Sequence, residues 1–575
     1  MVQMLLAKQG AFVRVLPILQ WLPAYEARWL RADVIAGLTL WGILVPEAIA
    51  YAAMAGAPLQ AGLYTLLGSL AVYAIFGTAR QAVSAPTSGS SIMIAAVVAP
   101  FLVADSAELH GLLLLLVLVV GIIFVLCGLL RLGFVTAFIS HSVMTGFIIG
   151  LAIHIAVSQA PKIFGLPRGH GETLYQIWEL IGRLDGANWA TFTVGAGALV
   201  LLYVLETRAP RAPAPLMIIA GGIIAASMLR LPEEHGVQVV GAMQAGLPSL
   251  SLPKANLDDV LDLLPGAFGI VLFVLSEALG VGYTLGRKYG YEIDPDQELI
   301  AIGIANVTAA CLGGLVSGCS MSSTAVNDRA GAKSQVSSLT AASLMLVTLT
   351  ALMPVFHNLP EAILGAVVIH AVVRMMRYRE LKRIYRFHAS EFGLAMLALF
   401  GVITVGILPG LAISVALSLL QFIWGASYLS VSRLRPVPGK EHTYDIVESP
   451  SDRGLIKGLE ILRLNGPLFF ANALRFRNEV RALLASNSPP RAILFSLHAN
   501  FGIDLSSTDA LLALVAEAER TETEVLFAEL QDSVRHMFRQ CGLLDRVGED
   551  RLFPTVDDGV QDYLKRHPTT GSGSF

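Results

Sequence analysis

The residues that could do chemistry lie in two short runs of small and hydroxyl-bearing side chains, each set inside an apolar stretch. The first run is SAPTSGSSI at residues 84–92, and the second is SGCSMSSTAVN at residues 317–327. Backbone amides in hydrocarbon need partners within the protein, so an interrupted helix is tolerated there only where protein or a cavity covers it. Both runs therefore predict that the chain lines a site at membrane depth.

A carboxylate precedes each polar run by a similar distance along the chain. Glu47 lies in GILVPEAIAYA before the first run, and Glu277 lies in VLFVLSEALGVGY before the second. An ionisable residue inside an apolar span is costly and is by default a functional candidate. Glu277 has no Lys or Arg within nine residues on either side, which suits it to carry a proton. Glu47 follows Pro46, so its alternative role is to bond backbone groups that a kink frees.

The composition places these residues in a polytopic membrane protein. The chain has 575 residues, of which 55% are hydrophobic and 14% charged, and its mean hydropathy is +0.65; these values are typical of membrane proteins. A net charge of −3 does not favour a nucleic-acid partner. The four cysteines lack the spacing of a metal site, so neither a structural metal nor a disulfide framework is expected.

Apolar stretches long enough to span a bilayer recur from about Asp33 to Ser430, and they divide into about fourteen spans. The clearest are 110–130, 139–157, 268–285, 339–356 and 392–408. Basic residues fall mostly at alternate turns, which predicts an even number of crossings with both ends in the cytosol. The basic cluster from Arg374 to Arg386 is interpreted as a topology anchor that contacts anionic lipid.

The sequence divides into five parts. Residues 1–30 are expected to form a cytosolic amphipathic segment, and residues 31–430 the transmembrane domain, with repeats at about 31–230 and 262–430. A linker is expected at 431–443. Alternating apolar and amphipathic stretches then predict strand–helix units in a small cytosolic α/β domain at 444–566. The low-complexity end, 567–575, is expected to be disordered or an expression remnant.

Interrupted segments at corresponding places in two halves indicate a transporter site built from inverted repeats. In the expected topology the span after Ser84 runs outward and the span after Ser320 runs inward, so their amino ends can meet at the midplane. Facing helix N-termini attract an anion through unpaired N–H groups and positive dipole ends. The hydroxyl groups that could add donors are those of Ser84, Thr87, Ser88, Ser320, Ser322 and Ser323. The alternative is that the small residues only let helices pack closely.

Several segments resemble signatures of the sulfate permease (SulP) family, bacterial relatives of the animal anion exchangers that include prestin. They are AGLTLWGILVPEAIAYAAMAGAPLQAGLYT, YAIFGTAR, GYEIDPDQELIAIGIANV and SMSSTAVNDRAGAKSQVSS. The resemblance implies a seven-plus-seven inverted-repeat membrane domain with core and gate bundles, followed by a cytosolic STAS domain. It also implies a homodimer in the inner (plasma) membrane, with substrate between the first, third, eighth and tenth spans.

By the same resemblance, Glu47 and Tyr51 belong to the first-span motif, and Glu277 corresponds to an eighth-span carboxylate that is implicated in coupling. Three positions depart from many relatives: Ser323 replaces arginine, Tyr283 replaces lysine and Glu47 replaces glutamine. Losing two cations and gaining an acid weakens the positive field around a substrate anion. Co-transport of protons, or of sodium, would restore the charge balance.

The segment HANFGIDLSSTDAL resembles the STAS loop that carries a phosphorylatable serine in related regulators. When Asp504 is matched to the aspartate of that loop, Leu505 takes the phosphorylatable position and Ser507 the position of a glycine. Control by phosphorylation is therefore not expected, and Ser506 is interpreted as a helix cap.

The sequence thus predicts a secondary active transporter of a small anion, either sulfate, bicarbonate or a dicarboxylate. Proton-coupled symport by alternating access is the leading mechanism, and sodium-coupled bicarbonate uptake is the alternative within the class. A channel-like or sensory protein regulated through STAS is the alternative from another class. The sequence contains no nucleophile–base motif, phosphate loop or metal-ligand set, so we expect neither an enzyme nor a cofactor.

Overall fold

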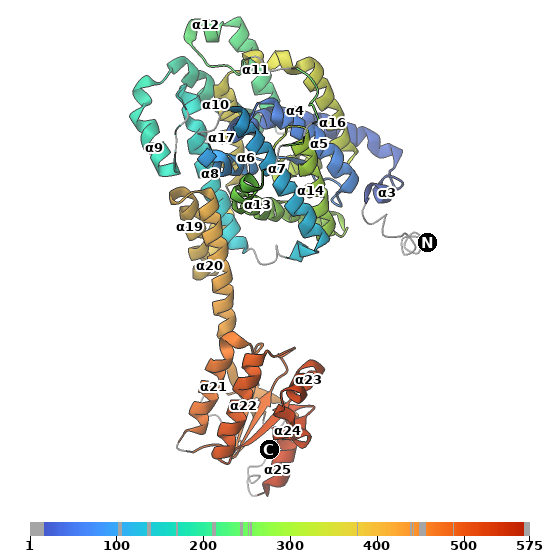
Figure 1. Ribbon diagram of the computed structural model, residues 1–575, viewed down its shortest axis with the longest axis vertical. Coiled ribbons are helices and arrows are strands. Elements are labelled where there is room, and N and C mark those ends of the chain that lie inside the picture. The colour runs from blue at the N-terminus through green and yellow to red at the C-terminus, as the bar shows by residue number, and fades with distance from the viewer. Residues whose placement is uncertain are drawn as a thin grey trace. The chain divides into compact units, whose positions relative to one another are not determined.

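The computed structural model describes residues 16–568 apart from 102–105, 135–139, 168, 170, 210–213, 242–244, 251, 254–255, 377, 438–439, 441, 448–455 and 487. The expected N-terminal segment lies partly, and the expected tail almost wholly, outside the described residues. The chain forms two compact units, residues 1–418 and 419–575. Each unit is coloured along the chain in Figure 1.

The first half of the helical unit contains, in chain order, α3 (Ile18–Trp21), α4 (Leu30–Ala55), α5 (Gln60–Phe76), β1 (Ser84–Pro86), α6 (Ser88–Val98), α7 (Ser106–Leu129), α8 (His141–Phe164), α9 (Thr173–Gly182), α10 (Trp189–Arg208), α11 (Ala214–Met228) and α12 (Leu231–His235). Trp21 on α3 donates a hydrogen bond from Nε1 to the carbonyl of Ala74 at 3.2 Å. The short helix is thereby fixed to α5.

The second half contains α13 (Leu257–Tyr289), α14 (Pro295–Cys311), β2 (Ser317–Cys319), α15 (Met321–Arg329), α16 (Val336–Val347), α17 (Glu361–Met375), α18 (Tyr378–Phe387), α19 (Ala389–Thr404) and α20 (Ile407–Ser427). After α16 the helical path continues through a π turn at Thr348–Leu352 and a 3₁₀ turn at Met353–Asn358. Within the described residues, seven helical stretches are long and apolar enough to cross a membrane, and four shorter apolar helices accompany them.

The helices pack in reciprocal pairs that relate the two halves. Helix α7 packs against α14 while α16 packs against α5, and α13 packs against α6 while α4 packs against α15. The later helices follow the same rule, because α8 packs against α19 while α10 packs against α17. If α4 and α13 are taken as equivalent starting points, each of these pairs is the counterpart of its partner pair. This packing pattern is that of an inverted repeat, in which two similar halves interlock around a pseudo-twofold axis.

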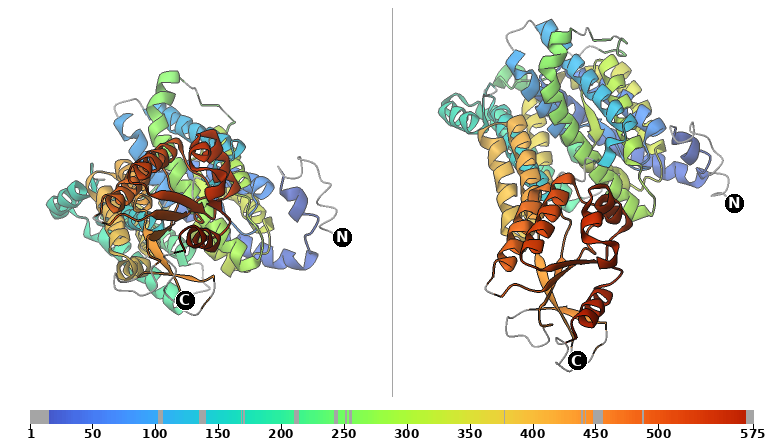
Figure 2. Two further views of the ribbon diagram at one scale, coloured as in Figure 1. Left: turned by 90° about the horizontal axis from the view of Figure 1, so that it is seen from below. Right: turned by 60° about the horizontal axis from the view of Figure 1, so that its bottom comes forward.

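The same contacts divide the helical unit into two bundles. Helices α4–α7 and α13–α16 pack mainly on one another, and we call them the core bundle. Helices α8, α10, α11, α17 and α19 form the other group, which we call the gate bundle together with α20, whose Gly410 approaches Gly401 on α19. Contacts between the bundles include those of α4 with α11 and α17, that of α11 with the 3₁₀ turn at Met353–Asn358, and that of α6 with α8. Figure 2 gives two further views of these helices.

The C-terminal unit is built on a six-stranded sheet of order β4-β3-β5-β6-β7-β8. Its elements are β3 (Val431–Pro436), β4 (Tyr444–Ile446), β5 (Leu459–Leu464), α21 (Phe470–Leu484), β6 (Ala492–Ser496), α22 (Leu505–Arg520), β7 (Glu524–Ala528), α23 (Asp532–Gln540), α24 (Leu543–Val547), β8 (Leu552–Phe553) and α25 (Val556–Arg566). Strands β5 to β8 are parallel, and β3 is antiparallel to both β4 and β5. The expected linker at 431–443 therefore contributes β3 to this sheet.

The side chains of this sheet alternate between two apolar layers, as the period of a strand requires. Phe495 and Phe527 join the cluster that includes α21 to α24, whereas Leu494 and Leu526 join the cluster with α25. Helices thus cover both faces of the sheet. The predicted strand–helix alternation is present, and the edge strands extend it.

Candidate functional site

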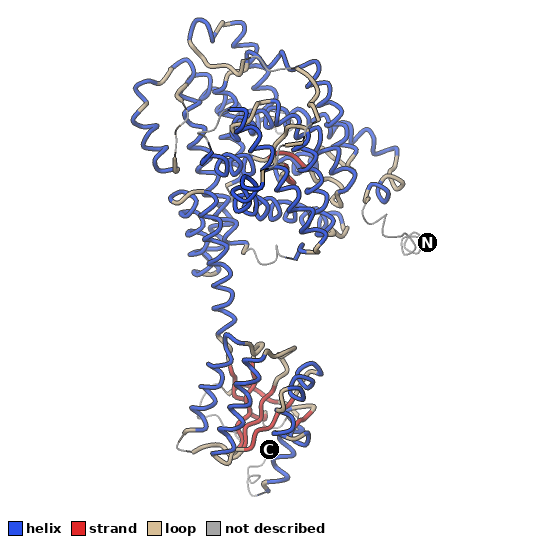
Figure 3. The backbone as a smooth tube through the Cα atoms, in the orientation of Figure 1, coloured by secondary structure: helices blue, strands red, loops and turns tan. Residues whose placement is uncertain are grey.

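Strands β1 and β2 are the first three residues of the two polar runs, and they pair with each other. The pairing is antiparallel, with Ser84 opposite Cys319 and Pro86 opposite Ser317. Figure 3 shows the two short strands in red among the helices. Helix α6 begins directly after β1, and α15 begins directly after β2. Because the strands are antiparallel, the two helices start at opposite ends of one three-residue pair and run in opposite directions.

The local sequence explains why each helix begins where it does. Pro86 ends β1, and it has no N–H group to continue a ladder or a helix before it. Thr87 is the N-cap of α6: its side chain accepts a hydrogen bond from Ser90 N at 3.1 Å, and the Ser90 hydroxyl accepts one from Thr87 N at 3.1 Å. Ser320 caps α15 by accepting a hydrogen bond from Ser323 N at 3.3 Å. Each polar run is therefore a strand, a cap and a helix start.

These caps change the expected role of some hydroxyl groups. Thr87 and Ser320 use their oxygen atoms to hold the first turns of α6 and α15. The Ser320 hydroxyl also lies 3.2 Å from that of Ser322 and 2.9 Å from that of Ser323. Ser322 is exposed, while the other predicted hydroxyl residues are buried. The caps fix the orientation of two positive helix ends, and those ends provide the field that favours an anion.

Two serines of the strand pair have hydroxyl groups that bond to nothing in the described part of the chain. Ser84 and Ser317 are fully buried, and neither Oγ atom has a hydrogen-bond partner there. Buried polar side chains are rarely left unsatisfied in native proteins. Ser84 was predicted from the sequence as a site residue, and Ser317 was not. Both hydroxyl groups therefore have unused hydrogen-bonding capacity beside the strand pair.

Helix α4 places two polar side chains, Glu47 and Tyr51, near the starts of α15 and α6. Glu47 lies within hydrogen-bonding reach of Ser323, and Tyr51 within hydrogen-bonding reach of Ser88. Glu47 and Glu277 are both close enough to act electrostatically on Tyr51. The structure thus brings the first-span motif, both helix starts and the acid of α13 into one cluster.

Helix α13 packs directly against both polar runs, and glycine makes this approach possible. A Cβ atom at Gly318 would lie 2.7 Å from Val274 Cγ1, and one at Gly89 would lie 2.4 Å from Phe273 Cζ. Glu277 follows Phe273 by one helical turn, so both project from the same face of α13. The elements that meet here are α4, α6, α13 and α15.

Two polar side chains of the second run, which were not singled out from the sequence, tie it to the first half. Thr324 Oγ1 accepts a hydrogen bond from Val83 N at 3.0 Å. Asn327 Nδ2 donates to the carbonyl of Gln81 at 2.9 Å. The sequence could have pointed to them, since both residues belong to the polar run SGCSMSSTAVN. Their spacing of three residues puts them on one face of α15.

Comparison with known proteins identifies the family. The family model described as the sulfate permease family matches residues 30–398, and that of the STAS domain matches residues 455–559. The chain belongs to the sulfate permease family. A probable sulfate transporter of Mycobacterium tuberculosis is 32% identical to this permease over 545 residues, covering 94% of this chain and 97% of the relative. The chloroplastic sulfate transporter 4.1 of Arabidopsis thaliana is 30% identical over 575 residues, covering 96% and 82%.

Solved structures share the fold of the permease. Murine solute carrier 26 family member A9, an anion transporter in its inward-facing state, matches with a TM-score of 0.90 at 24% identity, covering 97% of this chain and 96% of that one. The transmembrane domain of a cyanobacterial bicarbonate transporter matches with a TM-score of 0.59 at 22% identity, covering 69% and 98%. The predicted fold class and family are confirmed. The protein is a multi-pass membrane transporter with a STAS domain, and it is not an enzyme.

Proposed function

We propose that this permease is a secondary active transporter of a small oxyanion, which binds between the N-termini of α6 and α15. The observation that carries the proposal is the antiparallel pairing of Ser84–Pro86 with Ser317–Cys319, which fixes two helix starts on either side of a short ribbon. Two positive helix ends and nearby hydroxyl groups suit an anion without a fully buried cation. The orphan hydroxyl groups of Ser84 and Ser317 provide further donors.

Sulfate is the first substrate to test. Relatives that match nearly the whole chain are named as sulfate transporters, whereas the bicarbonate transporter resembles the chain in fold alone. Amide and hydroxyl groups would donate hydrogen bonds equally well to the oxygen atoms of sulfate, bicarbonate or a dicarboxylate. The donor set therefore defines the class of substrate, and the relatives favour one member of it.

We assign the coupling proton to Glu277. Its carboxylate lies on α13, whose Phe273 and Val274 contact the starts of the two runs, so a proton bound there would offset the charge of a nearby anion. Glu47 adds a second acid to the cluster, so the negative charges of the acids and the anion increase the need for a bound proton. Sodium is the alternative coupling ion.

Alternating access would move the core bundle against the gate bundle. The site residues lie on α4, α6, α13 and α15, on the strand pair β1–β2 and at the caps that follow it, so the site would travel with the core. The bundles meet through α4, α6 and the 3₁₀ turn that follows α16, and packed helices at such an interface can slide past one another. We further propose a homodimer in the inner (plasma) membrane, with both termini in the cytosol, and domain limits close to those expected from the sequence.

The test is uptake of radiolabelled sulfate, bicarbonate and fumarate into proteoliposomes under imposed proton and sodium gradients. We expect proton-driven accumulation of sulfate, and we expect Glu277→Gln to abolish accumulation while sparing sulfate exchange. Glu361→Gln, at the start of α17 and outside the cluster, is the matched control and should accumulate sulfate normally. Parental accumulation in Glu277→Gln would refute the coupling role, and flux without counterflow would indicate a channel.

A further inference from the structure

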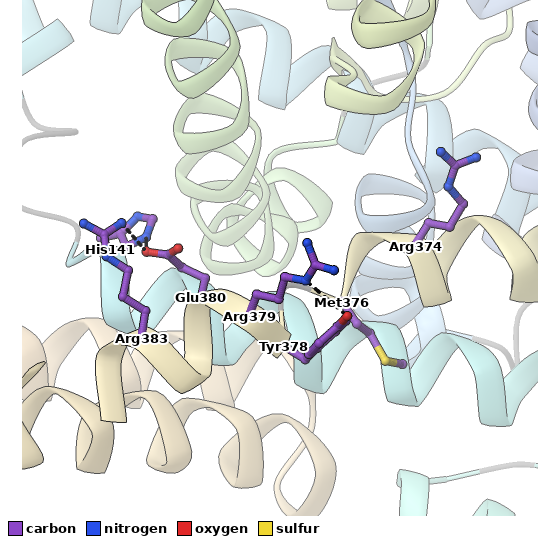
Figure 4. A pocket seen from close by; sticks show the side chains of 7 residues that line it. All are labelled: His141, Arg374, Met376, Tyr378, Arg379, Glu380 and Arg383. Atoms are coloured by element: carbon purple, nitrogen blue, oxygen red, sulfur yellow. Dashed lines mark hydrogen bonds and ion pairs between the residues drawn. The ribbon is translucent and has the colours of Figure 1, made fainter. Parts of the chain in front are cut away.

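A basic pocket of about 540 Å³ lies at one end of the gate bundle. It is lined by His141 at the start of α8, by Arg374 and Met376 at the end of α17, and by residues of α18. Those of α18 are Tyr378, Arg379, Glu380 and Arg383. Figure 4 shows Arg374 and Arg379 extending to the same side of the α17–α18 segment. Because basic residues concentrate on the cytosolic side of membrane proteins, we place this pocket at the cytosolic face.

The pocket holds more positive than negative charge. Arg383 Nη1 and His141 Nε2 both contact Glu380 Oε1, at 3.2 and 3.3 Å. Arg379 donates from Nε to the hydroxyl of Tyr378 at 3.3 Å, and it makes no ion pair within the described residues. Three guanidinium groups therefore face one carboxylate from the lining itself, so the pocket attracts anions.

Arg374 connects this pocket to the candidate site. Its guanidinium forms an ion pair with Glu206 Oε1 on α10, and the other oxygen of Glu206 lies 2.9 Å from His370 Nε2. Glu206 therefore holds Arg374 from a neighbouring gate helix. Arg374 is also close enough to act electrostatically on Glu47, and its helix α17 packs on α4. Arg374 thus lines the pocket and lies on the gate helix that packs on the helix of Glu47.

We propose that the basic pocket is the cytosolic entry site for the transported anion, and that Arg374, positioned by Glu206, is the cation that the anion meets opposite Glu47. This inference rests on the proposed function and adds a residue from the gate bundle to a site that is otherwise built by the core bundle. The core side of this site holds the hydroxyl of Ser323 beside Glu47. Arg374 supplies a positive charge to the same neighbourhood from the facing bundle.

The arrangement makes the contribution of Arg374 depend on conformation. Arg374 belongs to the gate bundle and Glu47 to the core bundle, so relative movement of the bundles changes the distance between them. An anion that enters from the cytosol encounters Arg374 before the core site. An anion that enters from the other side reaches the core site without passing Arg374. Arg374 therefore favours binding at one face of the membrane.

The test measures KM for sulfate separately at the two faces. Proteoliposomes in which the STAS domain faces outward are captured through a C-terminal tag, and internal or external sulfate is varied in counterflow. We expect Arg374→Gln to raise KM at the STAS face roughly three- to tenfold and to leave KM at the opposite face unchanged. Glu206→Gln removes the neutralising carboxylate, so it should lower KM at the STAS face.

Lys288→Gln is the matched control, because Lys288 is a comparably exposed cation in another ion pair: its side chain is 53% exposed, against 51% for Arg374. It should shift neither KM. Arg374→Lys keeps the charge and should restore near-parental KM, which a purely structural role of the guanidinium would not allow. Equal shifts at both faces, or no shift in Arg374→Gln, would overturn the inference. Absence of sulfate counterflow in the parent would instead refute the proposed function.

Discussion

Asn306 on α14 binds both backbone groups of Ser317: its Nδ2 donates to the Ser317 carbonyl at 2.9 Å, and its Oδ1 accepts from the Ser317 amide at 2.8 Å. On the other strand, Ser69 on α5 donates to the carbonyl of Ser84 at 2.9 Å. Helices α5 and α14 are equivalent in the two repeats. A pair of three-residue strands is not stable by itself, so these side chains set the separation of the two helix starts.

The first prediction concerns the amide of Asn306. Asn306→Ala leaves the buried amide and carbonyl of Ser317 without these partners, so it should destabilise the protein by roughly 2–4 kcal/mol. Ser69→Ala removes one hydrogen bond to a carbonyl and should cost only about 1 kcal/mol. Thermal unfolding of the two variants in detergent measures the difference. Equal stability of both variants would show that Asn306 does not support the ribbon.

The sequence predicted that the two polar runs meet, because interrupted segments at corresponding places in two halves indicate an inverted repeat. The runs contain Ser88 and Ser323, the cost of a charge inside a span pointed to Glu277, and these residues lie in one cluster. The sequence could not predict the strand pairing itself. Three residues such as Ser84–Pro86 carry no readable strand period, and their partner lies far along the chain.

The sequence also could not reveal which charges act together across the bundles. Arg374 was interpreted as a topology anchor, because basic residues at the end of a span usually are. Its contacts with Glu206 and its influence on Glu47 depend on the packing of α10, α17 and α4. In the STAS domain, Ser506 was interpreted as the cap, but the structure gives that role to Asp504. Asp and Ser are both favoured N-cap residues, so the cap could be assigned only once the structure showed at which residue α22 begins.

The second prediction uses the close contact between Gly318 and α13. A methyl group at this position would lie 2.7 Å from Val274 Cγ1, and Val274 is fully buried and cannot move aside easily. Gly318→Ala should therefore cost about 1–3 kcal/mol and weaken sulfate binding by displacing the start of α15. Gly280→Ala is the control, since a Cβ there meets no atom within 4 Å. In Gly318→Ala the unfolding temperature should fall and KM for sulfate should rise. In Gly280→Ala neither stability nor sulfate binding should be weakened.

The third prediction separates the two acids of the cluster. Glu47 lies beside Ser323, so its negative charge opposes the binding of an anion. Glu47→Gln should lower KM for sulfate several-fold and retain proton-driven accumulation, which we assign to Glu277. Uptake at varied sulfate concentration under a fixed proton gradient measures both quantities. Loss of accumulation in Glu47→Gln would transfer the coupling role to Glu47.

The last prediction concerns Asp504, which joins the starts of two STAS helices. Its carboxylate accepts hydrogen bonds from Ser507 N at 2.8 Å, from Ser507 Oγ at 2.6 Å and from Phe470 N at 2.6 Å. Burial acts to raise the pKa of Asp504, but these hydrogen bonds outweigh it and lower the pKa below the ordinary value of 3.8.

Because the folded pKa is the lower one, the stabilising contribution of Asp504 is fully present above pH 3.8 and is lost as the pH falls through the folded value. The protection factor of the amides at the start of α22, which is the intrinsic hydrogen-exchange rate relative to the observed rate at the same pH, should therefore fall in acid in the full-length protein. Asp504→Asn should lower this protection factor already at neutral pH and remove most of its acid dependence. Asp509→Asn, on the exposed face of the same helix, should match the parent. An unchanged acid dependence in Asp504→Asn would show that another group governs this junction.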